Sequence, residues 1–146
     1  MISSKSSAEE VGLTDKIPNL GIITAHPLQP LVESLRAFAQ ARDWEQFHTP
    51  KNLACALSVE ASELLEHFQW LTEAQSQSLT PDKTAQVAAE AADVFLYLLQ
   101  LCDKLGIDLI AAAQAKMLVN AQKYPAALAR GTAAKYTDLS ADLSPE

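Results

Sequence analysis

Apolar residues recur at intervals of three and four along four segments of the chain, the spacing that gathers side chains on one face of an α-helix. These segments predict helices at about 30–42, 50–71, 81–105 and 108–123. Four amphipathic helices joined by short connections are typical of an all-α, antiparallel four-helix bundle. The second and third helices are apolar or alanine-rich around much of their circumference, so we expect subunit association to complete the bundle.

Start and stop residues mark the ends of the predicted helices. Thr49-Pro50 and Thr80-Pro81 each combine an N-cap hydroxyl with a proline at the first helical position. Gly106 follows the third helix, where a glycine in the left-handed conformation ends many helices. These signals place the second helix after Thr49 and the third between Thr80 and Gly106.

The remaining segments lack sustained periodicity. We expect a loose N-terminal arm at 1–27, one helical domain at 28–125 and an extended C-terminal tail at 126–146. The segment 72–79 is rich in Gln and Ser and predicts a surface loop. No internal repeat of solenoid length occurs in the sequence.

Carboxylates interrupt the apolar faces of the second and third helices. Glu60 falls on the apolar stripe of its helix, and Glu63 follows three residues later. Glu90 and Asp93 flank the stripe of the next helix at the same spacing. An unpaired charge in an apolar interior costs several kcal/mol, so a counter-charge is expected. The two stripes consist of Leu53, Leu57, Leu64, Phe68 and Leu71, and of Val87, Ala91, Val94, Leu98 and Leu101.

Residues three apart are neighbours on a helix, so Glu60 with Glu63 and Glu90 with Asp93 each form a pair of carboxylates. Oxygen-only ligands suit hard cations, and the two pairs predict a site for Mg²⁺, with Mn²⁺ as a possible substitute. The alternative is that these acids are solvated on exposed helix faces. A di-iron site would need Glu-x-x-His within the helices, and Glu45 to His48, the one such spacing, precedes Pro50.

Other polar and aromatic residues follow the same helical arithmetic. Trp70 is seven residues past Glu63 and Tyr97 is seven past Glu90, which predicts that each aromatic shares a helix face with an acid. An aromatic beside a metal site can stack on a flat ligand, although both residues can equally be core aromatics. We expect Glu66 to face solvent or a second shell, and His67 to have a surface or packing role. On the fourth helix, one side carries Lys116, Asn120 and Lys123, with Tyr124 at its end, donors that suit phosphate oxygens.

Composition narrows the possible partners. A formal net charge of −7 argues against binding to a nucleic-acid backbone and implies that an anionic ligand needs a bridging cation. Cys55 and Cys102 lie among apolar residues, which favours reduced core cysteines of an intracellular protein. No signal peptide or bilayer-spanning segment is recognisable, so we expect a cytoplasmic protein without membrane contact.

The sequence carries no motif for a nucleophilic enzyme or a glycine-rich phosphate loop. Neither cysteine has a histidine nearby in the sequence that would activate it. Hydrolysis by a metal-activated water is the chemistry that remains, with Glu60 and Glu63 as candidate catalytic carboxylates.

These residues resemble the MazG-like all-α nucleotide pyrophosphohydrolases, and more narrowly their dCTP pyrophosphatase branch. The resemblance lies in the two acidic pairs, in Trp44-Glu45-Gln46-Phe47-His48, in Phe68-Gln69-Trp70 and in Lys123-Tyr124-Pro125, and it covers about 31–139. It implies hydrolysis of a nucleoside triphosphate between the α and β phosphates by a homodimer or homotetramer. It further implies Mg²⁺ on the four acids, a base between Trp44 and Trp70, contacts to base or sugar from Gln46, His48 and Tyr97, and contacts to the phosphates from Lys116, Asn120 and Tyr124.

One position departs from that branch. The mammalian members carry a His nine residues before the loop Trp, where this chain has Leu35. The resemblance therefore bears more directly on the reaction than on the base, for which we expect dCTP or a 5-substituted dCTP. The alternative function is a non-catalytic helical module that senses a nucleotide through the same pocket.

Overall fold

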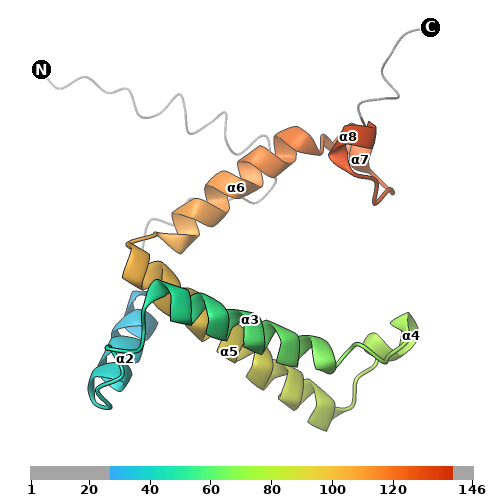
Figure 1. Cartoon of the computed structure of the whole chain (residues 1–146). Coiled ribbons are helices and arrows are strands. Elements are labelled where there is room, and N and C mark those ends of the chain that lie inside the picture. The colour runs from blue at the N-terminus through green and yellow to red at the C-terminus, as the bar shows by residue number, and fades with distance from the viewer. Residues whose placement is uncertain (1–26, 140–146) are drawn as a thin grey trace, which may run out of the picture. The chain divides into compact units, whose positions relative to one another are not determined.

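The computed structural model describes residues 27–139, and all the regular structure in that range is helical (Figure 1). The predicted all-α class is therefore confirmed. The expected N-terminal arm lies outside the described residues except for Pro27, as does the end of the tail at 140–146. The helices are α2 (Gln29–Gln40), α3 (Pro50–Glu66), α4 (Glu73–Ser76), α5 (Pro81–Leu105), α6 (Leu109–Lys123), α7 (Ala126–Ala129) and α8 (Tyr136–Leu139).

The predicted start and stop residues act as expected. The Thr49 hydroxyl accepts a hydrogen bond from the Asn52 amide at 3.3 Å, and the Thr80 hydroxyl accepts one from the Lys83 amide at 3.3 Å. Each hydroxyl satisfies one of the amides that the first turn of a helix leaves unpaired. Gly106 ends α5 with a φ of 65°, a left-handed conformation that costs glycine little.

The second helix is shorter than predicted. It ends at Glu66 instead of about 71, because the amides of Phe68 and Gln69 both bond to the Leu65 carbonyl and close a turn. Thr72 then caps α4 reciprocally with Gln75, a capping box within the segment expected to be a loop. The tail is also not simply extended, since its described part contains the two short helices α7 and α8.

The described residues divide into two compact units, one that ends at Leu109 and one that begins at Ile110. In the first unit α3 and α5 lie side by side, and α2 packs on α5 (Figure 1). Glu60 of α3 lies near Asp93 of α5. His67, just past the end of α3, contacts Lys83, which lies earlier on α5, so the two helices are antiparallel.

The side chains buried within the described residues are few. They are Ala39 of α2, Leu53 of α3, and Leu99 and Cys102 of α5. These residues sit where the three helices meet, at the end of the α3–α5 pair nearest α2. Cys102 is the reduced core thiol that the sequence predicted, and burial raises its pKa. Cys55 is also a free thiol, but it is exposed in this chain, so its predicted core position is wrong for the single subunit.

Candidate metal centre

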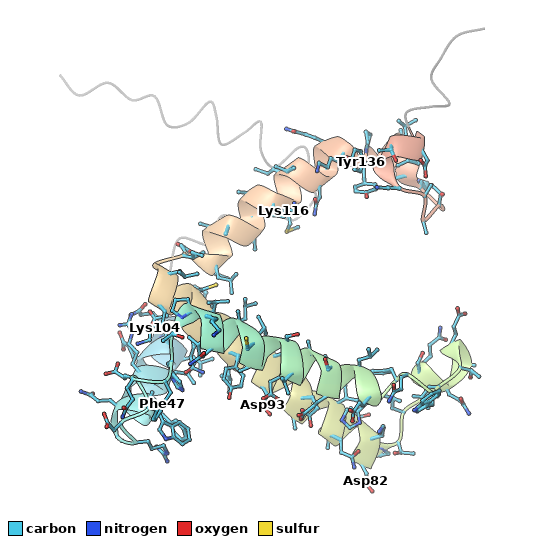
Figure 2. The ribbon with its side chains drawn as sticks, in the orientation of Figure 1. Phe47, Asp82, Asp93, Lys104, Lys116 and Tyr136 are labelled. Atoms are coloured by element: carbon cyan, nitrogen blue, oxygen red, sulfur yellow. The ribbon has the colours of Figure 1, made fainter. Side chains whose placement is uncertain are left out.

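Three of the four predicted metal ligands converge between α3 and α5. One carboxylate oxygen each from Glu60, Glu90 and Asp93 lies within 4.8 Å of the others. Glu60 comes from α3 and the other two come from α5, in the stretch where the two helices run side by side (Figure 2 labels Asp93). The antiparallel pairing therefore brings together acids that are separated by about thirty positions in the sequence.

The electrostatics of the cluster are unfavourable without a cation. Burial and the negative charges of Glu63, Asp93 and Glu90 raise the pKa of Glu60 above its usual value. Each of these effects disfavours the ionised carboxylate. Glu60 and Glu90 are half-buried and Asp93 is exposed. A bound divalent ion would offset the repulsion that the three carboxylates impose on one another.

The donor set and its spacing fit such an ion. Opposite oxygens of an octahedral Mg²⁺ shell are about 4.2 Å apart, so a span within 4.8 Å needs only small side-chain rotations. Glu63 is not one of the three convergent acids, although its charge reaches Glu60. It lies next to them, in the wall of a neighbouring cavity.

That cavity has a volume of about 400 Å³ and is lined by Glu63, Glu66, His67, Lys83 and Glu90. The Lys83 Nζ atom lies 2.6 Å from Nδ1 of His67. An ammonium group has only donors, so Nδ1 accepts and Nε2 carries the ring hydrogen. The Nε2 atom faces Glu90 at 4.0 Å, so His67 links a lysine to one of the convergent acids.

The sequence did not indicate the contact between His67 and Lys83. His67 was expected to have a surface or packing role, but it lies between Lys83 and Glu90. Lys83 precedes Glu90 by seven residues, about two helical turns, so helical spacing alone would have placed both on one face of α5. Glu66, expected to face solvent or to lie behind the metal ligands, is exposed and lines the same cavity.

A second group of candidate residues occupies the connection between α2 and α3. Trp44 packs edge-on against Phe38 with ring centroids 5.8 Å apart, and against His48 at 6.2 Å. The guanidinium of Arg42 lies 3.5 Å from the centre of the Phe38 ring. These contacts hold the exposed Trp44 in one place, which a binding residue in a connecting segment requires.

Polar contacts fix the backbone of the same connection. Asp43 adopts a positive φ of 55°, which Asp tolerates better than most residues. Gln46 donates to the Asp43 carbonyl at 2.9 Å and to its carboxylate at 2.7 Å. Asn52 donates to the Phe47 carbonyl at 2.9 Å and ties the connection to α3. Gln46 thus stabilises the connection itself. The ligand contact that the resemblance implies for Gln46 stays a prediction.

An ion pair that the sequence did not reveal joins α2 to α5. Arg36 Nε donates to Asp103 Oδ2 at 2.8 Å, and its Nη2 atom pairs with Oδ1, so the contact is bidentate. The Arg36 hydrogen bond and charge hold the pKa of Asp103 below its usual range, and the pKa of Arg36 is raised in turn. The two residues are 67 positions apart, and no local pattern connects them.

The aromatic residues predicted to share faces with the acids differ in outcome. Trp70 lies beyond the end of α3, so its predicted place on the helix face of Glu63 is wrong. Its side chain is 86% exposed, the largest exposure among the big apolar residues of the described chain. Tyr97 lies within α5, one turn past Asp93, and is half-buried.

The predicted phosphate contacts lie on α6 and at its end. Lys116, Asn120 and Tyr124 are all exposed. Tyr124 packs edge-on against Tyr136 at 6.1 Å, and the ammonium of Lys123 lies 5.1 Å from the centre of that second ring. These residues belong to the second unit, and their role toward the acids stays a prediction.

Comparisons with known proteins agree with the resemblance in the sequence. The chain matches the MazG-like family over residues 55–139. It is 44% identical over 117 residues to dCTP pyrophosphatase 1 of Rattus norvegicus, covering 76% of this chain and 69% of that protein, and 43% identical to the Homo sapiens protein over the same extent. The crystal structure of a pyrophosphatase from Archaeoglobus fulgidus superposes with a TM-score of 0.65 and 42% identity, covering 69% of this chain and 94% of that one.

Proposed function

The chain belongs to the MazG-like family, and from that premise we propose that it is a nucleoside triphosphate pyrophosphohydrolase that releases a monophosphate and pyrophosphate. The relatives named dCTP pyrophosphatase 1 support dCTP as the substrate, and we propose a 5-substituted dCTP as the alternative. The observation that carries the proposal is the convergence of Glu60, Glu90 and Asp93 from two helices. A hydrolase of a polyanion needs cations, and this acidic chain supplies a site for them.

The roles of the acids follow from their positions. Glu60, Glu90 and Asp93 would hold the metal ion, with Mg²⁺ first and Mn²⁺ as a substitute. When bound, Mg²⁺ would lower the pKa of a coordinated water and offset charge on the phosphates. Glu63 lies outside the convergent trio, so its carboxylate can complete the metal shell or accept the proton of the attacking water.

The contact between Lys83 of α5 and His67 helps to hold Glu90 in place. His67 presents Nε2 to Glu90, and Lys83 fixes the orientation of the ring. Partners of this kind orient metal-binding carboxylates and raise metal affinity. We therefore assign both residues to positioning Glu90.

The connection between α2 and α3, residues 41–49, supplies the base-binding surface and is called the aromatic connection below. Trp44 is held against Phe38 and His48, and base stacking on an aromatic side chain is worth about 1–3 kcal/mol. Trp70, almost wholly exposed in its own subunit, is available to cover a base from the other side. Gln46, His48 and Tyr97 are proposed as contacts to base or sugar, and Lys116, Asn120 and Tyr124 as contacts to the phosphates.

Subunit association is part of the proposal, as a homodimer or homotetramer. Apolar side chains project from the α3–α5 pair, among them Val59, Leu65 and Phe95, and Leu65 is 60% exposed. The expectation that no segment could span a bilayer is wrong by length and composition alone, because an 18-residue window of α5 has a mean hydropathy of 1.3. Only 11% of that window is buried within the chain. Because α5 also carries charged carboxylates, which are costly in lipid, we propose that a second protein subunit covers this apolar surface.

The direct test is release of pyrophosphate from dCTP with Mg²⁺, with EDTA as the control. The proposed enzyme forms one pyrophosphate for each dCMP and stops when EDTA is added. Binding of dCTP without any turnover would instead identify a nucleotide-sensing module. No thermal stabilisation by Mg²⁺ or nucleotide would indicate a purely structural protein.

A further inference from the structure

A small cavity lies between α2, the aromatic connection and α5. Its volume is about 80 Å³, room for two or three water molecules, so it suits the edge of one ring rather than a whole nucleoside. Its lining includes the apolar side chains of Leu35 and Leu99. It also includes polar side chains, those of His48, Gln100 and the Arg36–Asp103 pair.

Asp103 has unused hydrogen-bonding capacity in this cavity. Its two oxygens accept from Arg36, and a carboxylate offers about four acceptor positions, so about two remain. Its side chain is 18% exposed, against 57% for Arg36, so Asp103 is the more enclosed partner. Because Arg36 lowers the pKa of Asp103, the group stays an ionised acceptor without a donor hydrogen at neutral pH.

The cavity shares His48 with the proposed base-binding surface. The His48 ring packs edge-on against Trp44 at 6.2 Å and also lines the cavity. His48 therefore joins Trp44 to the lining of the cavity. Glu45 of the same connection is 3.9 Å from Lys104 of α5, which closes the cavity on that side.

We propose that this cavity receives the edge of the pyrimidine and that Asp103 accepts a hydrogen bond from its 4-amino group, which selects cytosine over uracil and thymine. Arg36 is a positioning residue that holds the carboxylate in place. The inference rests on the proposed function and assigns its base preference to named residues. A 4-oxo group would present an acceptor to an acceptor, and such an unpaired buried contact lowers affinity by about ten- to a hundredfold.

The test compares substrates that differ at one position. The pairs are dCTP with dUTP, and 5-methyl-dCTP with dTTP, each measured as kcat/KM with Mg²⁺. The wild-type chain should prefer each amino substrate by tenfold or more. Asp103→Ala should lower that ratio at least tenfold, mainly through lost activity on the amino substrates. Asp103→Asn, whose amide can accept or donate, should lower the amino-to-oxo ratio as well. This second variant keeps the test valid if the alanine variant fails to fold.

Two further measurements separate recognition from structure. Arg36→Lys should retain part of the preference, whereas Arg36→Gln should lose more of it. Calorimetric binding of dCMP and dUMP should show the same change of ratio without turnover. Glu73→Gln is the control, because it removes an exposed acid of α4 that does not line the cavity, and it should leave the ratio unchanged.

The outcomes are distinct. An amino-to-oxo ratio that falls in both Asp103 variants, with turnover retained, supports the assignment. A ratio that stays at the wild-type value in folded, active Asp103 variants overturns it and leaves the proposed function intact, and so does an equal loss on both substrates. A wild-type chain without any Mg²⁺-dependent turnover overturns the proposed function and this inference with it.

Discussion

Replacing Glu60 with Gln should stabilise the metal-free protein while removing its response to Mg²⁺. The substitution keeps the shape of the side chain and removes one of three carboxylates whose oxygens lie within 4.8 Å of one another. At that distance each pair of charges repels by about 1 kcal/mol even at the dielectric constant of water. Glu60 has two such neighbours, so the variant should gain about 1–2 kcal/mol in the free energy of unfolding.

The gain should depend on pH in a definite direction. A carboxyl whose pKa is raised by folding stabilises the folded state below its unfolded value, here 4.5, and that contribution is lost as the pH rises through the folded value. At pH 8 the wild-type group is ionised and repelled, so Glu60→Gln should be the more stable protein. Below about pH 4 the wild-type group is protonated, and the two proteins should unfold alike.

Differential scanning calorimetry with EDTA, at one protein concentration, measures this directly. The expected gain at pH 8 corresponds to a Tm about 2–8 °C higher for a chain of this size. Adding Mg²⁺ at a hundred times its Kd should raise the wild-type stability by about 2.7 kcal/mol and leave the variant unchanged. Glu73→Gln, an exposed acid of α4, is the control and should change the stability by less than about 0.5 kcal/mol. A variant that is less stable at pH 8, or that responds to Mg²⁺ like the wild type, would refute the reasoning.

Four further predictions test other parts of the site. Glu63→Gln should abolish pyrophosphate release with an unchanged circular dichroism spectrum; a tenth of the activity remaining would remove Glu63 from the site. Lys83→Met should free the His67 ring and weaken Mg²⁺ binding by roughly tenfold in calorimetry, and an unchanged Kd would contradict this. Trp70→Ala should lower kcat/KM for dCTP about tenfold at constant Tm, because the side chain is 86% exposed; an unaltered kcat/KM would exclude it from the base site. Leu65→Lys should shift the sedimentation coefficient toward the monomer, and wild-type sedimentation would show that this surface does not form the interface.

Helical periodicity and capping residues predicted much of the fold because both are local. Thr49 and Thr80 begin helices and Gly106 ends one as the sequence predicts. The end of α3 was predicted less well, since the apolar spacing continues through Phe68 and Leu71 while the backbone closes a turn on Leu65. Where the helix ends is decided by backbone hydrogen bonds, and the spacing of apolar residues does not reveal these bonds.

The acidic cluster was predictable because both of its pairs have helical spacing. The spacing of residues along one helix does not predict which side chain of another helix they contact. The bidentate contact of Arg36 with Asp103 joins positions 67 residues apart, and it depends on how α2 packs against α5. The exposure of Cys55 was missed for a related reason, because an apolar helix face predicts burial without saying which chain provides it.

Hydrolysis of dCTP in water enriched in ¹⁸O tests the central claim most directly, with Mg²⁺ present and a parallel reaction in EDTA. Attack of water on the α-phosphorus, with pyrophosphate as the leaving group, predicts dCMP that carries one ¹⁸O atom, unlabelled pyrophosphate in equal amount, and no reaction with EDTA. Release of inorganic phosphate, label in the pyrophosphate, or turnover that persists in EDTA would contradict it.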